Sequence, residues 1–225
     1  MCTILHPTAD LFRSRLRRLA GEAQASGGRV PMREIFALAK EMADMPVREI
    51  ERLLDDADHG VRVGAVSIMD WQARRRTTDA EARQALFDLY LRRHDRIDNW
   101  DLVDRCAPSV VGGYLQDKSR EPLYHLARSD SQWKRRTAIV ATYHFIKRDE
   151  LDDTFAIAEI LVHDDADLVR KAVGGWIREA GKRDPARLLR FLDRYAGTMP
   201  RTMLRYALEH QSPETRRHYM HAIDE

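Results

Sequence analysis

A small residue recurs at a fixed phase along this chain, and that recurrence constrains the fold more than any other feature. Each copy is an alanine shortly after a basic residue in a helical pattern, and the copies are Ala65, Ala107, Ala138, Ala172 and Ala207. The gaps between them are 42, 31, 34 and 35 residues. Gaps of this size are typical of stacked helical hairpins, in which a small side chain lets one helix approach its neighbour. The pattern therefore predicts an all-α fold, a curved α-solenoid of HEAT-like helical repeats.

Apolar residues at helical spacing fill the segments around these alanines. They predict helices over 9–25, 32–44, 47–57, 79–93, 119–128, 149–162 and 185–195. No linker of low complexity divides the 225 residues. We therefore expect a single domain over 1–225, with N-terminal helices in 1–45 and repeats in 46–220. The concave face of a solenoid of this size is wide enough for a rod-like partner, and duplex DNA is the obvious rod, so we expect the repeats to carry a DNA cleft.

Composition excludes several classes of protein. No apolar run approaches the roughly 18 residues of a membrane span, and the N-terminus lacks the basic and then apolar order of a signal peptide. Cys2 and Cys106 are too few for a disulfide framework or a zinc site, which fits a reducing cytoplasm. Net charge is only +2, so affinity for nucleic acid must come from the placement of charge. Nothing in the sequence demands more than a monomer.

The stretch 98–104, Asp-Asn-Trp-Asp-Leu-Val-Asp, gathers an aromatic and three acids in the middle of the chain. In a helix, Trp100 and Asp104 lie four residues apart and share one face. An aromatic ring beside a carboxylate suits a site that grips a flat cation. The alternative is an ordinary helix start, with Asp98 or Asn99 as the cap and Trp100 as packing, and spacing alone favours this alternative.

Four segments resemble the AlkD-like DNA alkylation repair glycosylases, which are built from HEAT-like repeats. They are NWDLVD at 99–104, SDSQWKRRTAI at 129–139, DLVRKAVGGWIREAGKRDP at 167–185 and MPRTMLRYALE at 199–209. The resemblance covers residues 45–220, in the family's order. It implies a monofunctional hydrolase that releases cationic N3- and N7-alkylated purines from double-stranded DNA and leaves an abasic site. It also implies no metal, no cofactor and a bacterial-type cytoplasmic enzyme that works on the nucleoid.

The resemblance also assigns roles to single residues. The catalytic carboxylate falls on Asp104, with Trp100 as the aromatic beside it. Arg136 is expected to hold a backbone phosphate, where a guanidinium fork suits the geometry, and the alternative for it is an ion pair between repeats. Further candidates for contact with the DNA are Arg135, Lys171, Trp176 and Arg201.

One position departs from the family pattern. Where the pattern K-A-x-G-W places a second cleft tryptophan, this chain has Gly175, and its own tryptophan follows as Trp176. One residue along a helix rotates a side chain by about 100°. We therefore expect Trp176 to occupy a different place, which alters one wall of the damage pocket.

The chemistry of the substrate favours a single carboxylate. An alkylated purine already carries positive charge, so its departure needs no general acid. Asp104, ionised in a partly dry cleft, would then stabilise an oxocarbenium-like sugar and position water. Two other functions stay open: a DNA-binding relative with little or no catalysis, suggested by Gly175, and a HEAT-repeat scaffold that binds proteins.

The string His163-Asp164-Asp165-Ala166-Asp167 resembles a metal-binding sequence. It lacks the glycine and the distal glutamate of a calcium loop. Because it directly precedes a predicted helix, we interpret these acids as capping residues.

Overall fold

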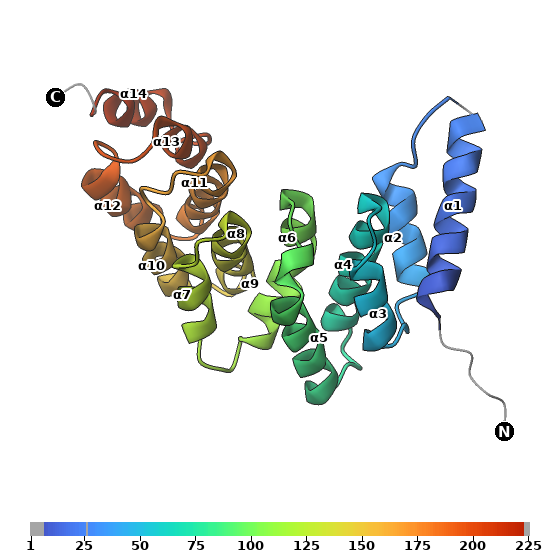
Figure 1. Ribbon diagram of the computed structural model, residues 1–225. Coiled ribbons are helices and arrows are strands. Elements are labelled where there is room, and N and C mark those ends of the chain that lie inside the picture. The colour runs from blue at the N-terminus through green and yellow to red at the C-terminus, as the bar shows by residue number, and fades with distance from the viewer. Residues whose placement is uncertain (1–6, 26, 223–225) are drawn as a thin grey trace. The chain divides into compact units, whose positions relative to one another are not determined.

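The computed structural model describes residues 7–25 and 27–222, and every regular element in these ranges is helical (Figure 1). The fold class is all-α, as the alanine spacing predicts. The chain forms two compact units, unit 1 (residues 1–114) and unit 2 (residues 115–225). No helix in the described ranges is long and apolar enough to cross a membrane. Cys106 is a buried free thiol, and Cys2 lies outside the described residues.

Unit 1 arranges its helices in two layers. Helices α2, α4 and α6 pack in sequence against one another, and α1, α3 and α5 do the same in the second layer. The elements are α1 (Ala9–Ala25), α2 (Met32–Glu41), α3 (Val47–Leu54), α4 (His59–Arg74), α5 (Ala80–Arg92), the 3-10 turn η1 (His94–Arg96), α6 (Trp100–Cys106) and the π-helical turn η2 (Ala107–Gly112).

Unit 2 repeats this plan. Helices α8, α11 and α13 form one layer, and α7 and α10 pack together behind it. The elements are α7 (Glu121–Ala127), α8 (Gln132–Ala141), α9 (Tyr143–Ile146), α10 (Asp152–Ile160), α11 (Asp167–Gly181), α12 (Pro185–Tyr195), α13 (Arg201–Ala207) and α14 (Pro213–His221).

Neighbouring helices of one layer run in the same direction. The evidence is that polar contacts connect the start of one helix to the start of the next, and the end of one helix to the end of the next. In unit 1, His59 at the start of α4 contacts Asp101 in the first turn of α6. Asp70, near the end of α4, contacts Ser109, which follows α6. The chain between two parallel neighbours must return through the other layer, which is how a helical repeat is built.

Unit 2 shows the same direction of travel. Arg135, in the first turn of α8, pairs with Asp164, which lies just before α11. Arg178, near the end of α11, pairs with Glu209, which follows α13. Each unit is therefore a stack of helices that run parallel within a layer.

The alanines that set the predicted period lie in these layers. Ala65 lies in α4, Ala107 directly follows α6, and Ala138, Ala172 and Ala207 lie in α8, α11 and α13. All of them are buried. A methyl group at each of these positions fills a site where a larger side chain would separate the helices.

Helices α11 and α13 approach each other closely at Gly174. A Cβ atom on Gly174 would lie 2.3 Å from the main-chain oxygen of Met203 and 2.7 Å from Cβ of Tyr206. Only glycine fits here without moving a helix. The next residue differs, because a Cβ atom on Gly175 would meet no atom of the described chain within 4 Å.

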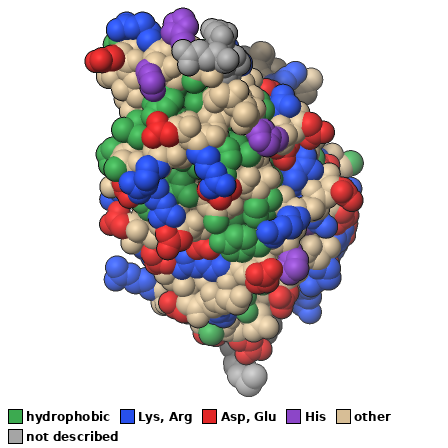
Figure 2. Space-filling view, turned by 90° about the vertical axis from the view of Figure 1, so that its left-hand side faces the viewer, with side chains coloured by type: hydrophobic (Ala, Val, Ile, Leu, Met, Phe, Trp, Pro, Cys, Tyr) green, Lys and Arg blue, Asp and Glu red, His purple; other side chains and the backbone are tan. Residues whose placement is uncertain are grey.

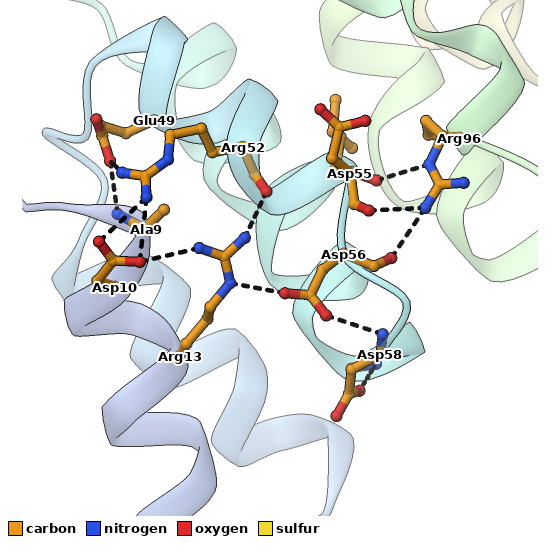
Figure 3. Close-up of polar contacts among 11 residues, drawn as sticks. Ala9, Asp10, Arg13, Glu49, Arg52, Asp55, Asp56, Asp58 and Arg96 are labelled. Atoms are coloured by element: carbon orange, nitrogen blue, oxygen red, sulfur yellow. Dashed lines mark hydrogen bonds and ion pairs between the residues drawn. The ribbon is translucent and has the colours of Figure 1, made fainter.

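Ion pairs connect the second layer of unit 1 (Figure 3). Arg13 of α1 donates to Asp56 at 2.6 Å and to the main-chain oxygen of Arg52 at 2.6 Å. Arg52 in turn pairs with Asp10 at 3.1 Å and with Glu49 at 2.8 Å. The hydrogen bond from Arg52 holds the pKa of Asp10 below its ordinary value, so this carboxylate stays ionised at neutral pH.

Candidate active site

Helix α6 starts at a side-chain cap. The carboxamide oxygen of Asn99 accepts a hydrogen bond from the amide of Trp100 at 2.7 Å. One carboxylate oxygen of Asp101 accepts a hydrogen bond from the amide of Leu102 at 3.0 Å. The stretch 98–104 is therefore a capped helix start, as the alternative interpretation held, but Trp100 is exposed and does not serve as the packing residue that this interpretation expected. That role uses Asn99 and Asp101, so it leaves a separate role open for Asp104.

Helix α6 stops at Cys106, two residues before Pro108. Proline has no amide proton for the main-chain oxygen four residues earlier, and its ring crowds that oxygen. In this chain the oxygen belongs to Asp104. The chain continues as η2, a π-helical turn, which is a rare geometry that is frequent at functional sites. Asp104 thus lies in the last turn of a helix only seven residues long.

The carboxylates of the stretch have different surroundings. Asp98 pairs with Arg62 at 3.1 Å, and Asp101 lies 2.7 Å from Nε2 of His59. Both partners belong to α4, so these two acids join α6 to α4. The side chain of Asp104 is partly exposed.

Trp100 and Asp104 lie on one side of α6. They are one helical turn apart, as the sequence predicts, because both fall within the continuous helix Trp100–Cys106. Trp100 is open to solvent, with 51% of its surface exposed. A large exposed ring gives up the burial that stabilises most tryptophans, which is typical of a binding surface. The structure thus brings these two predicted site residues together.

Asp70, which is not among the residues predicted for the site, holds the end of α6. Asp70 lies in α4, is 4% exposed, and accepts a hydrogen bond from Ser109 Oγ at 2.6 Å. Its carboxylate also lies 3.4 Å from Arg105 and 3.2 Å from Arg74. A signal was present, because Asp70 is the one acid in the largely apolar run 61–71.

Arg135 and Arg136 lie at the contact between α8 and α11. Arg135 donates to Asp164 at 2.5 Å, and Arg136 donates to the main-chain oxygen of Leu168. Arg136 is only 7% exposed. Both guanidinium groups therefore join segments of unit 2, Arg135 through an ion pair and Arg136 through a hydrogen bond to a main-chain oxygen. Contact between either residue and a DNA phosphate stays a prediction.

Lys171 and Arg201 are closer to solvent. Lys171 is half-buried and pairs with Asp167, one turn earlier on α11, at 2.7 Å. The hydrogen bond to Asp167 raises the pKa of Lys171, so the ammonium group stays charged. Arg201 is exposed and donates to the main-chain oxygen of Met220 at 2.5 Å. Both positive groups lie at the surface of unit 2. Their contact with DNA stays a prediction.

Trp176 packs against a neighbouring ring. Its ring centre lies 4.7 Å from that of Tyr143, and the residue is half-buried. Gly175, where the family pattern has tryptophan, borders open space. The ring of Trp176 is therefore occupied by an aromatic contact within unit 2, and its role toward DNA stays a prediction.

The acidic string 163–167 serves the fold. Asp164 accepts a hydrogen bond from the amide of Ala166 at 2.9 Å, besides its pair with Arg135. Ala166 is the N-cap residue of α11 and has no side-chain cap, so Asp164 orders the turn before the helix and the capping interpretation is wrong for it. Within residues 7–25 and 27–222, no group of three or more His, Cys, Asp or Glu side chains could hold a metal ion.

Charge is interspersed on the face of the molecule drawn in Figure 2. Blue and red side chains alternate across it, around a central patch of apolar ones. Pairs between second-layer helices of unit 2 show the same alternation, such as Arg120 with Asp153 at 2.6 Å and Arg187 with Asp152 at 2.6 Å. Many of the arginines are thus neutralised by nearby acids, in keeping with the small net charge.

The geometry of α6 fits a site, and comparison with known protein families shows the family to which the chain belongs. A model of the DNA alkylation repair enzyme family matches residues 22–211. The chain belongs to this family. The match includes α6 and continues through α13, so it takes in all the predicted site residues of this DNA alkylation repair enzyme. A search of the curated proteins finds no match.

Proposed function

We propose that this DNA alkylation repair enzyme is a monofunctional glycosylase that releases cationic N3- and N7-alkylated purines from double-stranded DNA. The observation that carries the proposal is the pairing of an exposed Trp100 with Asp104 on one side of α6, inside the family match. Asp104 is the carboxylate we assign to the reaction, because it lies one helical turn from the exposed ring of Trp100 and its side chain is partly exposed.

The reaction follows from the charge of the substrate. Alkylation at N3 or N7 makes the purine ring cationic. When the bond between C1′ and the base nitrogen breaks, its electron pair leaves with the base, which becomes neutral. The base therefore needs no protonation by the enzyme, and the positive charge that develops moves to the deoxyribose.

Asp104 has two tasks in this proposal. Its negative charge stabilises the oxocarbenium-like sugar, an interaction that strengthens as the sugar becomes positive and therefore lowers the barrier. It also accepts a hydrogen bond from the water that adds to C1′, and the proton of that water passes to the carboxylate or to solvent. The products are a free alkylpurine and an abasic site.

Trp100 complements the carboxylate. The face of an indole ring is electron-rich and attracts a cation that lies over it. A cationic base or a positive sugar next to the exposed ring of Trp100 would gain this attraction. A neutral purine would gain less, which favours the damaged nucleotide over the many undamaged ones.

A DNA-binding relative with little or no catalysis is the second candidate. The observation that favours it is the open space beside Gly175, where the family pattern has an aromatic wall. Such a protein would bind DNA and release no base. The two candidates therefore differ in product and not in affinity.

The test is the appearance of free base. Wild-type enzyme is incubated with duplex DNA that carries 7-methylguanine and 3-methyladenine, and the released bases are separated and quantified. We expect both free bases, with one abasic site for each base released. DNA that binds tightly but releases no base would refute the glycosylase and favour the second candidate.

Two controls sharpen the test. Duplex DNA with unmodified purines should release nothing, because a neutral purine is a poor leaving group without a general acid. Binding measured at rising salt concentration should weaken steeply if phosphate contacts hold the DNA. A flat salt dependence would instead point to a scaffold that binds proteins.

A further inference from the structure

Asp70 is a buried charge with three partners, two of which flank the end of α6. Arg105, the residue after Asp104, lies 3.4 Å from the carboxylate, and Ser109 of η2 donates to it at 2.6 Å. Arg74 of the same helix as Asp70 supplies a second positive group at 3.2 Å. A buried carboxylate that is paired in this way is held firmly, because loss of any partner would leave charge without compensation.

Arg105 is held on three sides. Besides its approach to Asp70, its Nε donates to Ser67 Oγ at 3.1 Å, and its guanidinium lies over the ring of Phe36 at 4.4 Å. Ser67 belongs to α4 and Phe36 to α2. The side chain next to Asp104 is thus fixed to two neighbouring helices of its layer.

The end of α6 lies close to both Asp70 and Asp104, as the thiol of Cys106 shows. Cys106, at the end of α6, is fully buried, and burial raises the pKa of its thiol well above the ordinary value. The negative charge of Asp70 raises it further, and that of Asp104 adds to the effect. Asp70 and Asp104 therefore lie close enough to the same thiol to act on it electrostatically.

Helix α6 depends on such contacts for its orientation. Seven residues are too few for a stable isolated helix, and Pro108 ends its hydrogen-bond pattern. A side-chain tip lies about 5–6 Å from a helix axis, so a rotation of about 10° moves it by about 1 Å. A displacement of that size at a reacting group can slow a reaction on the order of 100-fold.

We propose that Asp70 is a positioning residue for the repair reaction, which it serves by fixing the rotation of α6 through Arg105 and Ser109 and thereby the place of the Asp104 carboxylate. This inference rests on the proposed glycosylase function. Asp70 does not touch the substrate in this account. Its loss should therefore slow the chemical step and leave DNA affinity intact.

The experiment compares Asp70→Asn and Ser109→Ala with wild type in the full chain. Asn keeps an acceptor for Ser109 but loses the charge that holds Arg105, and Ser109→Ala removes a single hydrogen bond. A duplex with one 7-methylguanine is used under single-turnover conditions, below the unfolding temperature of every variant. Affinity for the same duplex is measured by fluorescence anisotropy.

The matched control is Asp153→Asn in unit 2. Asp153 also accepts from a hydroxyl, that of Tyr124 at 2.8 Å, and from an arginine, Arg120 at 2.6 Å. Its loss disturbs a similar network of polar contacts within unit 2. We expect its rate of base release to stay within a factor of about two of wild type.

For Asp70→Asn we expect release roughly 10- to 100-fold slower, with Kd for the duplex within a factor of about two, and a smaller fall for Ser109→Ala. Rates equal to wild type in both variants would overturn the proposal, as would an equal fall in Asp153→Asn. If Asp70→Asn does not fold, Ser109→Ala decides by the same criterion. A wild type that releases no base would overturn the proposed function, and this inference with it.

Discussion

The contact of α4 with α6 and the contact of α11 with α13 join equivalent helices in two different ways. In unit 1, side chains at both ends of α4 hold α6, from His59 with Asp101 to Asp70 with Ser109. In unit 2, the backbone at Gly174 approaches α13 so closely that a single added carbon would collide with it. Polar side chains fix the contact of α4 with α6 at both ends, whereas the contact of α11 with α13 combines the pair of Arg178 with Glu209 and a close approach of the two backbones.

This difference bears on where a site can develop. Polar bonds fix the rotation of a helix and can be altered one at a time, so they suit a helix whose side chains must point in a set direction. A close-packed glycine contact fixes distance and tolerates no addition at that point. We infer that the polar contact belongs to the helix with the proposed chemistry for this reason.

The largest expected effect on the free energy of unfolding is at the buried ion pair between Asp164 and Arg135. Asp164 is 3% exposed and holds Arg135, so Asp164→Ala leaves a mostly buried guanidinium without its main counter-charge. We expect a loss of about 3–5 kcal/mol in the free energy of unfolding, measured by urea denaturation.

The control for that variant is the next residue. Asp165 contacts the same arginine at 3.2 Å but is 92% exposed, so Asp165→Ala should change the free energy of unfolding by about 0.5 kcal/mol or less. Equal losses in the two variants would show that burial does not decide the strength of these polar contacts.

The second prediction tests the close-packed contact. Gly174→Ala places a Cβ against the Met203 main chain, and we expect a loss of about 1–3 kcal/mol in the free energy of unfolding. Gly175→Ala adds the same carbon one residue later, in open space. Because alanine favours a helix over glycine, that variant should gain about 0.5–1 kcal/mol. A gain in both variants would refute the close contact of α11 with α13.

The third prediction concerns the loss of stability in acid that a histidine of unit 2 causes. Burial, together with the charges of Arg148 and Lys147, lowers the pKa of His144 in unit 2 from 6.5 to about 4. Between these two pH values the unfolded chain binds a proton that the folded chain does not, so stability falls as the pH falls through this window. The loss should be on the order of 1–2 kcal/mol, since the partly exposed ring is screened by solvent.

Urea denaturation at pH 7 and pH 5 checks this prediction. His144→Gln should remove most of the difference between the two pH values. His125→Gln, at an exposed position on α7, should leave it unchanged. If His144→Gln keeps the full pH dependence, the buried neutral ring is not its source.

The smallest expected effect is at the exposed end of the polar contact. Arg62→Ala removes the pair with Asp98, whose side chain is 42% exposed. We expect a loss of about 0.2–1 kcal/mol in the free energy of unfolding, and less at high salt, where charges are screened. A loss as large as that of Asp164→Ala would break the distinction between exposed and buried polar contacts.

Much of the fold follows from local pattern in the sequence. The helix over 9–25 and the helix over 185–195 have the predicted limits, because apolar spacing, glycine and proline mark both ends. The segment predicted as 32–44 ends earlier, at Glu41, and the segment predicted as 149–162 is observed as Asp152–Ile160. Periodicity marks the buried face of a helix better than its last turn, where turns and helix share composition.

The site was predictable in part. The shared face of Trp100 and Asp104 follows from their spacing once the stretch is helical. The partners of Arg135 and Arg136 do not, because a basic residue at a helix start is compatible with a phosphate or with an acid about thirty residues on. The role of Asp70 was not predictable either, because its partners Arg105 and Ser109 lie more than thirty residues away, in α6 and η2, and spacing does not indicate contacts between separate helices.

The most direct test of the account is the rate of base release by Asp104→Asn. The variant keeps the shape of the side chain and removes the charge that the proposed mechanism uses. Under single-turnover conditions on a duplex with one 7-methylguanine, we expect release at least about 100-fold slower than wild type, with unchanged affinity for the duplex. Release at the wild-type rate would contradict the assignment of the chemistry to Asp104 on α6.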